Sequence, residues 1–146
     1  MRRVITFGTF DLFHVGHVAI IERARALGDH LTVGVSTDAL NLRKKGKNPV
    51  FSEQDRLRII SSLKAVDEVF LEESLEQKES YVRQFQADIL VMGDDWTGRF
   101  DFLLPICEVV YLPRTPEISS TGIKDYLQSA DFQSNQPRRH ASNPAP

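Results

Sequence analysis

Two histidines, separated by two residues, are the first feature of this sequence with the chemistry of a binding site. His14 and His17 lie in a short segment, Gly8 to His17, with Gly16 directly before the second histidine. The segment follows an apolar run and precedes an amphipathic one, so it is expected to form the turn between a strand and a helix. The N-terminus of a helix presents backbone N–H groups and a partial positive charge. An imidazole beside it suits a phosphate, and Gly16 would allow close approach of that phosphate to the backbone.

Metal binding is the alternative use of this pair, since histidine is a common metal ligand. A zinc site takes roughly three or four protein ligands. No well-placed third ligand is found, because His30 is expected at a strand edge, His140 in a tail and Cys107 directly before a strand. No metal ligand is therefore assigned, and the position of the histidines favours phosphate.

A basic cluster, Arg43 to Lys47, lies in a polar connection that runs from Thr37 to Phe51. Charge runs are usually solvated loops. This one follows a strand that is expected beside the first strand, so it lies at the same carboxyl edge of the sheet. Lysine is a mobile point charge that can follow phosphate oxygens during a reaction. The cluster is therefore interpreted as part of a long functional loop.

Two further groups of polar residues follow predicted strands. Arg114 precedes three consecutive hydroxyl residues, Ser119 to Thr121, at a predicted helix start. One hydroxyl is enough for a helix cap, so this set is better explained as a cradle for a triphosphate. Asp94 and Asp95 follow an apolar strand. They could hold a nucleotide hydroxyl, a base amine, or Mg²⁺ through water.

The elements that position these residues follow from hydrophobic spacing. The predicted strands are Val4–Phe7, Leu31–Ser36, Val69–Leu71, Ile89–Met92 and Val109–Leu112. The predicted helices are His17–Leu27, one opening at Ser52, one capped by Ser74, a short one over Phe100–Leu104, and one capped within Ile118–Thr121 that ends near Leu127. This alternation predicts an α/β fold, a Rossmann-like open parallel five-stranded sheet with helices on both faces. All candidate residues then fall at the carboxyl ends of strands, where ligands bind in such sheets.

Length and composition limit the classes of protein. The chain has 146 residues, and we expect one domain over residues 1–128 and a disordered tail over residues 129–146, rich in Gln, Ser, Asn and Pro. The formal net charge of −2 argues against nucleic acid or an anionic membrane as the main partner. The single cysteine gives no disulfide framework, and no apolar run approaches the length of a membrane span. The expected location is the cytoplasm.

Taken together, these segments resemble the signatures of the cytidylyltransferases, a family of the HxGH nucleotidyltransferases. Gly8–His17 is similar to the first signature and Arg114–Thr121 to the second. Gly93–Asp101 is similar to the corresponding segment of glycerol-3-phosphate cytidylyltransferases, a branch that supplies teichoic-acid precursors, and the resemblance extends from Met1 to about Leu127. It implies transfer of CMP from CTP to sn-glycerol 3-phosphate, giving CDP-glycerol and pyrophosphate. It also implies direct in-line attack, Mg²⁺ with the nucleotide, and a homodimer.

The resemblance implies roles for individual residues. His14, His17, Lys44 and Arg114 are expected to be catalytic, and Lys44 and Lys78 to bind the acceptor. The residues expected to bind the nucleotide are Thr9, Phe10, Asp11, His14, Gly16, His17, Lys47, Asp94, Arg114, Thr115, Ile118, Ser119, Ser120 and Thr121. The acceptor phosphate is already an anion, so the reaction requires positioning and neutralisation of charge rather than a strong general base.

The sequence departs from the family pattern in two places. The basic loop contains one more residue than expected, so either Lys45 or Lys47 takes the second phosphate-binding role. Lys64-Ala65 stands where the family often has Arg-Tyr, and lysine lacks the bidentate fork of arginine. Two alternative functions remain: a related cytidylyl- or adenylyltransferase with a different phosphorylated acceptor, and a non-catalytic nucleotide-binding module.

Overall fold

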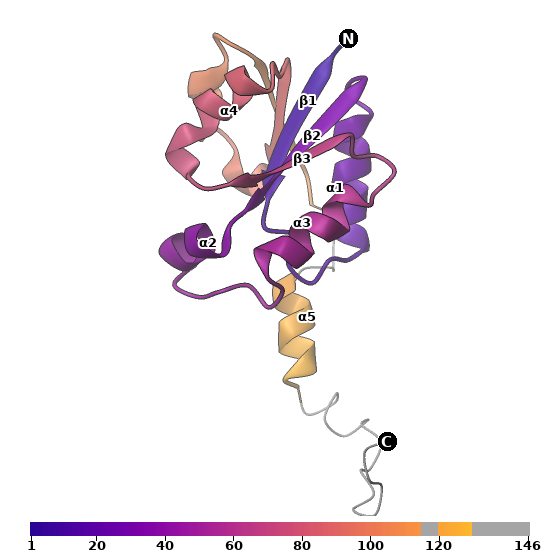
Figure 1. The fold of residues 1–146 in the computed structure, drawn as a ribbon, viewed down its shortest axis with the longest axis vertical. Helices are drawn as coiled ribbons and strands as arrows, with labels where there is room; N and C mark the ends of the chain where they lie inside the picture. Colours follow the sequence, from indigo (N-terminus) through magenta and orange to yellow (C-terminus); the bar gives the residue numbers. More distant parts are fainter. Residues whose placement is uncertain (115–119, 130–146) are drawn as a thin grey trace, which may run out of the picture.

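A parallel five-stranded sheet forms the centre of the computed structural model, which describes residues 1–114 and 120–129 (Figure 1). The strands are β1 (Arg3–Gly8), β2 (His30–Ser36), β3 (Glu68–Glu72), β4 (Ile89–Gly93) and β5 (Glu108–Leu112). Their order is β3-β2-β1-β4-β5, and every neighbouring pair is parallel. This is the Rossmann order, which reverses direction between β1 and β4. The predicted fold class is confirmed.

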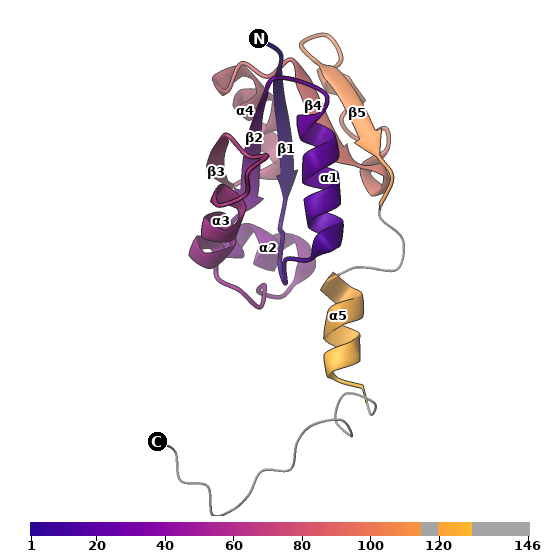
Figure 2. The ribbon, with the colours of Figure 1, turned by 90° about the vertical axis from the view of Figure 1, so that its right-hand side faces the viewer.

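Helices cover both faces of the sheet (Figures 1 and 2). The α-helices are α1 (Val15–Arg25), α2 (Asp38–Lys45), α3 (Glu53–Ser61), α4 (Lys78–Gln84) and α5 (Ser120–Leu127); single 3₁₀ turns are η1 (Leu75–Gln77), η2 (Asp94–Trp96) and η3 (Asp101–Leu103). On one face, Ile21 of α1 and Ile60 of α3 pack in one core cluster with strand residues. On the other face, Val82 of α4 and Leu103 of η3 pack in a second cluster with Phe7. None of the helices described here has the length and apolar character of a membrane span.

The connection after β2 differs from the prediction. It was predicted as a polar loop, but its first half forms α2. Thr37 caps this helix by accepting a hydrogen bond from the backbone N–H of Leu40 at 3.1 Å, and Gly46 ends it in the left-handed region with φ 75°. Leu40 and Asn41 are the buried residues of this helix. Lys44 therefore lies in the last turn of a helix, where a cation complements the helix dipole.

The region after β3 also differs in detail. Ser74 caps the single turn η1 by accepting from the backbone N–H of Glu76, and α4 begins only at Lys78.

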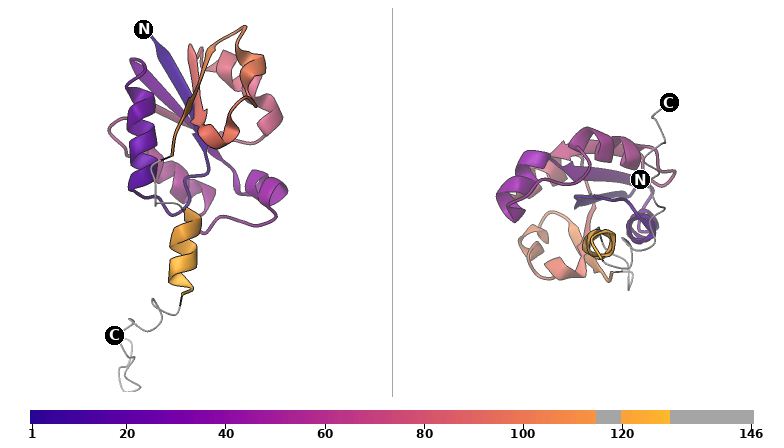
Figure 3. Two further views of the ribbon diagram at one scale, coloured as in Figure 1. Left: turned by 180° about the vertical axis from the view of Figure 1, so that it is seen from behind. Right: turned by 90° about the horizontal axis from the view of Figure 1, so that it is seen from below.

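All five strands end at the same edge of the sheet, at the lower end in Figure 1, where α2 and the start of α5 also lie (Figures 1 and 3). The rest of α5 extends away from the domain. Residues 130–146 of the predicted tail lie outside the described residues.

Candidate active site

His14 and His17 form a reciprocal cap at the start of α1. The Nδ1 atom of His14 accepts a hydrogen bond from the backbone N–H of Gly16 at 3.0 Å, and Nδ1 of His17 accepts from the backbone N–H of His14 at 3.2 Å. The two rings are stacked, with centroids 3.8 Å apart. This cap is the reason why α1 begins at Val15, two residues before the predicted start.

The cap also decides which nitrogen of each imidazole carries the proton. Since Nδ1 accepts from a backbone N–H in both rings, the neutral side chains carry their proton on Nε2. The Nε2 atom of His14 is buried, and within the described part of the chain it has no hydrogen-bond partner. A buried donor without a partner is costly, so this N–H is available for an oxygen atom of a ligand.

Both histidines are neutral near pH 7. Burial lowers the pKa of His14, and burial together with the charge of His14 lowers the pKa of His17 to about 4, although Asp11 acts in the opposite direction. The ring of His17 also lies against Phe13 and Phe10, with centroids 5.3 and 5.6 Å away. The pair can therefore donate hydrogen bonds to phosphate without holding a positive charge in the free protein.

The loop between β1 and α1 is held in a strained conformation. Phe10 and Leu12 have φ angles of 55° and 49°, in the left-handed region that is unfavourable for such side chains. Thr9 Oγ1 donates to Asn41 Oδ1 at 2.9 Å and lies 3.0 Å from Ser36 Oγ. Backbone strain of this kind is typical of ligand-binding loops whose surroundings fix them.

Arg56 of α3 holds this loop through hydrogen bonds, although it was not among the predicted site residues. Its guanidinium group is fully buried and donates to the backbone oxygens of Thr9, Ser36 and Phe51 at 2.9, 2.7 and 3.0 Å. It also donates to the carboxylate of Asp38 at 2.7 Å. Arg56 precedes Ile60 by one turn on the buried side of α3. A charged residue on an apolar stripe was the available signal in the sequence.

Asp11 joins three segments of the site. Its carboxylate accepts from the backbone N–H groups of Val50 and Phe51 at 2.7 and 2.9 Å, and Lys124 Nζ of α5 lies 3.2 Å away. Ser120 donates to the backbone oxygen of Asp11. Burial raises the pKa of Asp11, but these hydrogen bonds and Lys124 outweigh it and leave the pKa below its ordinary value. Asp11 therefore links the segments that surround it. The structure also adds Lys124 to the candidate site, although no sequence pattern marks this residue.

The lysines of the basic cluster occupy different environments. Burial, with the charge of Lys45, lowers the pKa of Lys44 to about 8. Burial also lowers the pKa of Lys45, assisted by the positive charges of Lys124 and Lys47, whereas Asp11 raises it. Lys45 therefore lies within electrostatic range of Asp11, Lys124 and Lys47. This arrangement keeps both Lys45 and Lys47 as candidates for phosphate.

Lys78, predicted to bind the acceptor, is buried with 1% of its surface exposed. Its ammonium group forms an ion pair with the carboxylate of Glu72 and lies 3.9 Å from the centroid of the Phe7 ring. Glu72, which was not among the predicted site residues, is also 1% exposed. Lys78 lies near the carboxyl edge and is paired with Glu72, and its contact with the acceptor stays a prediction.

Two of the remaining predicted residues, Asp94 and Arg114, follow the ends of β4 and β5. Asp94 begins η2 directly after β4, and Arg114 follows β5 and donates to Asp95 at 2.8 Å. Ser120 and Thr121 form the first turn of α5. Thr115, Ile118 and Ser119 lie outside the described residues. The structure therefore brings the first signature and the described residues of the second, Arg114, Ser120 and Thr121, to one edge of the sheet.

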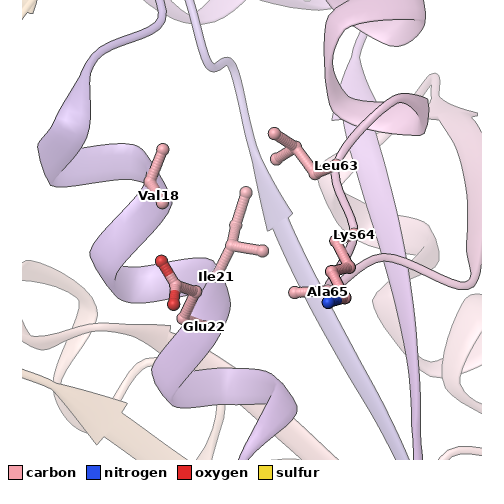
Figure 4. Close-up of a pocket in the computed structure, with 6 residues that line it drawn as sticks. All are labelled: Val18, Ile21, Glu22, Leu63, Lys64 and Ala65. Atoms are coloured by element: carbon pink, nitrogen blue, oxygen red, sulfur yellow. The ribbon is translucent and has the colours of Figure 1, made fainter.

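An apolar hollow lies away from this edge, between α1 and the segment that follows α3 (Figure 4). Its volume is about 320 Å³, and it is lined by Val18, Ile21, Glu22, Leu63, Lys64 and Ala65. Figure 4 shows Lys64 and Ala65 opposite Glu22 across the hollow. The hollow contains the residues that depart from the family pattern, and none of the predicted nucleotide-binding residues lines it.

Comparisons with known proteins identify the family and support the fold. The model of the family described as cytidylyltransferase-like matches residues 5–126. The chain is 51% identical over 127 residues to the glycerol-3-phosphate cytidylyltransferase of Bacillus subtilis (strain 168), covering 87% of this chain and 98% of the relative. It is 47% identical over 131 residues to the enzyme of the same name from Staphylococcus aureus (strain NCTC 8325 / PS 47), covering 90% and 98%. A solved structure of a lipopolysaccharide core biosynthesis protein from Thermoplasma volcanium GSS1 is similar with a TM-score of 0.70 and 31% identity, covering 79% of this chain and 98% of that one.

Proposed function

The chain belongs to the cytidylyltransferase-like family, and we propose that its residues 1–128 form a catalytic domain that transfers CMP from CTP to sn-glycerol 3-phosphate. A phosphate oxygen of the acceptor attacks the α-phosphorus of CTP in line with the bond to the β-phosphate. That bond breaks, its electron pair leaves with pyrophosphate, and CDP-glycerol is formed. The similarity to glycerol-3-phosphate cytidylyltransferases over nearly their whole length supports this choice of substrates.

The observation that carries the proposal is the unpartnered Nε2–H of His14 at the N-terminus of α1. A neutral donor held by a backbone cap needs no reorganisation when negative charge moves from the α-phosphate to pyrophosphate. Lys44, Lys47 and Arg114 would supply the positive charge. Thr9, Phe10, Asp11 and Gly16 would shape the nucleotide site, Asp94 would contact the nucleoside, and the second signature would hold the triphosphate.

Mg²⁺ is proposed to arrive with CTP rather than as a resident ion. Among the described residues, no three His, Cys, Asp or Glu side chains converge as a metal-binding cluster. The Asp11 carboxylate accepts from Val50 and Phe51 and is paired with Lys124. Mg²⁺ commonly binds through substrate phosphates with few protein ligands. Chelation by EDTA should therefore abolish turnover and leave the melting temperature of the nucleotide-free protein unchanged.

A homodimer in the cytoplasm is the proposed form of the enzyme. The apolar hollow between α1 and the segment after α3 carries Glu22 and Lys64, so a two-fold axis across it would bring opposite charges together. Analytical ultracentrifugation should give about twice the chain mass of 16.6 kDa. Sedimentation of the protein as a monomer at micromolar concentration would contradict this part of the proposal.

The test of the reaction is a pyrophosphate-release assay with four nucleoside triphosphates against several phosphorylated alcohols. The proposal expects release with CTP and glycerol 3-phosphate above all other pairs. Preference for ATP or another acceptor would indicate a different transferase of the same superfamily. Binding of CTP without release in any pair would indicate a nucleotide-binding module.

A further inference from the structure

A buried pair of charges lies beside Lys44 at the carboxyl edge of the sheet. Glu72 is the last residue of β3, and Lys78 is the first residue of α4. Their side chains form an ion pair, and each residue is 1% exposed. Lys78 Nζ also lies 3.9 Å from the ring centroid of Phe7 and 5.4 Å from that of Phe100.

Stability alone does not explain this pair. A buried ion pair loses the hydration of both ions, and an apolar pair of similar volume is often equally stable or more so. Lys78 also begins α4, where a positive charge opposes the helix dipole. Buried, paired ionisable groups near a candidate site are more often functional than scattered ones.

The pair is connected to the helix that carries Lys44. The backbone oxygen of Glu72 accepts from the N–H of Thr37, the cap of α2, at 3.0 Å. Arg43, the neighbour of Lys44, donates to the backbone oxygen of Glu73 at 2.7 Å. The end of β3 and both ends of α2 are therefore linked by hydrogen bonds.

Charged groups from four elements act on Lys44. Lys45 on its own helix, Arg56 of α3 and Lys78 of α4 all disfavour its protonated form, as burial does more strongly. Glu72 of β3 favours that form. The carboxylate of Glu72 thus opposes the mutual repulsion of Lys44 and Lys78.

We propose that Glu72 is a positioning residue for the reaction: its buried carboxylate holds Lys78, and the hydrogen bonds between the end of β3 and α2 hold the helix that presents Lys44 to the phosphate of the acceptor. This inference rests on the proposed function, in which Lys44 binds that phosphate. Glu72 acts through the two lysines and needs no contact with the substrate. The carboxylate of Glu72 sets the net charge of the acceptor side of the site. That charge must be positive to attract a phosphate dianion, and the repulsion between the two lysines must remain small when no phosphate is bound.

The test compares the pH dependence of pyrophosphate release in five proteins: wild type, Glu72→Gln, Lys78→Met, Glu73→Gln and Lys44→Arg. Glu73 is the exposed neighbour of Glu72 and serves as the matched control. If loss of a nearby carboxylate lowers the pKa of Lys44 by about one unit, its protonated fraction at pH 8 falls from about a half to about a tenth. Glu72→Gln should therefore lose about fivefold in kcat/KM for glycerol 3-phosphate at pH 8 and stay within about twofold of wild type at pH 6.

The alkaline limb of the pH profile is the range in which kcat/KM falls as Lys44 loses its proton. Lys78→Met should shift this limb in the opposite direction, to higher pH, because it removes a positive neighbour of Lys44. Glu73→Gln should leave the whole profile unchanged. Lys44→Arg should remove the limb, because arginine stays protonated, and this assigns the limb to Lys44. Equal losses at pH 6 and pH 8 in Glu72→Gln, or an unmoved limb in Lys78→Met, would overturn the inference. Should Glu72→Gln fail to fold, Lys78→Met still gives the answer.

Failure of the proposed function is distinguishable from failure of this inference. A wild-type protein that releases no pyrophosphate at any pH refutes the proposed function only. The titration of Lys44 can then be followed by NMR through its ¹³Cε chemical shift, without turnover. A lower midpoint in Glu72→Gln and a higher one in Lys78→Met would support the role of Glu72, and unchanged midpoints would refute it.

Discussion

Replacing His14 with asparagine should separate the helix cap that this side chain forms from its proposed role as a hydrogen-bond donor to phosphate. Nδ1 accepts from the backbone N–H of Gly16 at 3.0 Å, and a short amide oxygen can do the same. Asparagine is among the best N-cap residues, whereas alanine at this position costs about 0.5–2 kcal/mol. The free energy of unfolding of His14→Asn should therefore exceed that of His14→Ala by about 1 kcal/mol. Urea denaturation measures this difference.

Turnover should respond differently, because asparagine does not place a donor where Nε2 of His14 lies. Removing one preorganised donor to developing negative charge costs about 2.7–4 kcal/mol, which is a loss of about 10²–10³-fold in kcat. Both His14 variants should show this loss in the pyrophosphate-release assay. His30→Asn is the matched control, because its Nδ1 is also buried without a partner among the described residues, but it lies at the opposite end of β2. Activity of His14→Asn within threefold of wild type, or equal destabilisation of both His14 variants, would refute the reasoning.

Three further predictions concern the groups around this donor. Burial, together with His14, lowers the pKa of His17 to about 4, so the unfolded chain takes up a proton below about pH 6.5 that the folded protein does not. The urea concentration at the midpoint of unfolding should therefore decrease as the pH is lowered from 6.5 to 4. The decrease should be smaller in His17→Asn, and equal decreases in the two proteins would exclude His17 as the cause. Arg56→Lys keeps the charge but cannot reach four acceptors, so the free energy of unfolding should drop by about 2–4 kcal/mol, and an unchanged urea midpoint would contradict the bonding described. Lys124→Met removes the ion pair with Asp11, so the KM for CTP should rise about fivefold with little change in the KM for the acceptor; a rise in the acceptor KM alone would show that α5 serves the other substrate.

The fold was predictable because its strands are short apolar runs, such as Ile89–Met92, which are typical of a sheet covered on both faces. Helix α2 was not predictable in the same way. Its segment is highly polar, and only Leu40 and Asn41 are buried, so it lacks a clear apolar stripe. Its cap at Thr37 and its left-handed end at Gly46 fix it, and both are weak signals among other polar residues.

The candidate site was predictable in its location but not in its internal bonding. The carboxyl ends of parallel strands meet at one edge, which brings His14, Asp94 and Arg114 together by topology alone. The bonds that fix the loops join distant positions: Arg56 reaches Thr9 across 47 residues, and Ser120 reaches Asp11 across 109. Sequence spacing carries no information on such contacts. Glu72 could not be predicted for the same reason, because its partner Lys78 lies on the next α-helix.

The distribution of charge at this edge indicates how binding energy could be reserved for the reaction. The histidine pair is neutral, and three cations at this edge lie on other elements, each paired with a carboxylate: Lys124 with Asp11, Lys78 with Glu72 and Arg114 with Asp95. In the proposed reaction, a triphosphate would compete with the carboxylates of Asp11 and Asp95 for their cations, which weakens its attraction in the ground state. Charge that moves to pyrophosphate in the transition state strengthens the attraction to the same cations. Interactions that are stronger in the transition state than in the ground state raise kcat, so the paired carboxylates favour catalysis over tight binding of CTP.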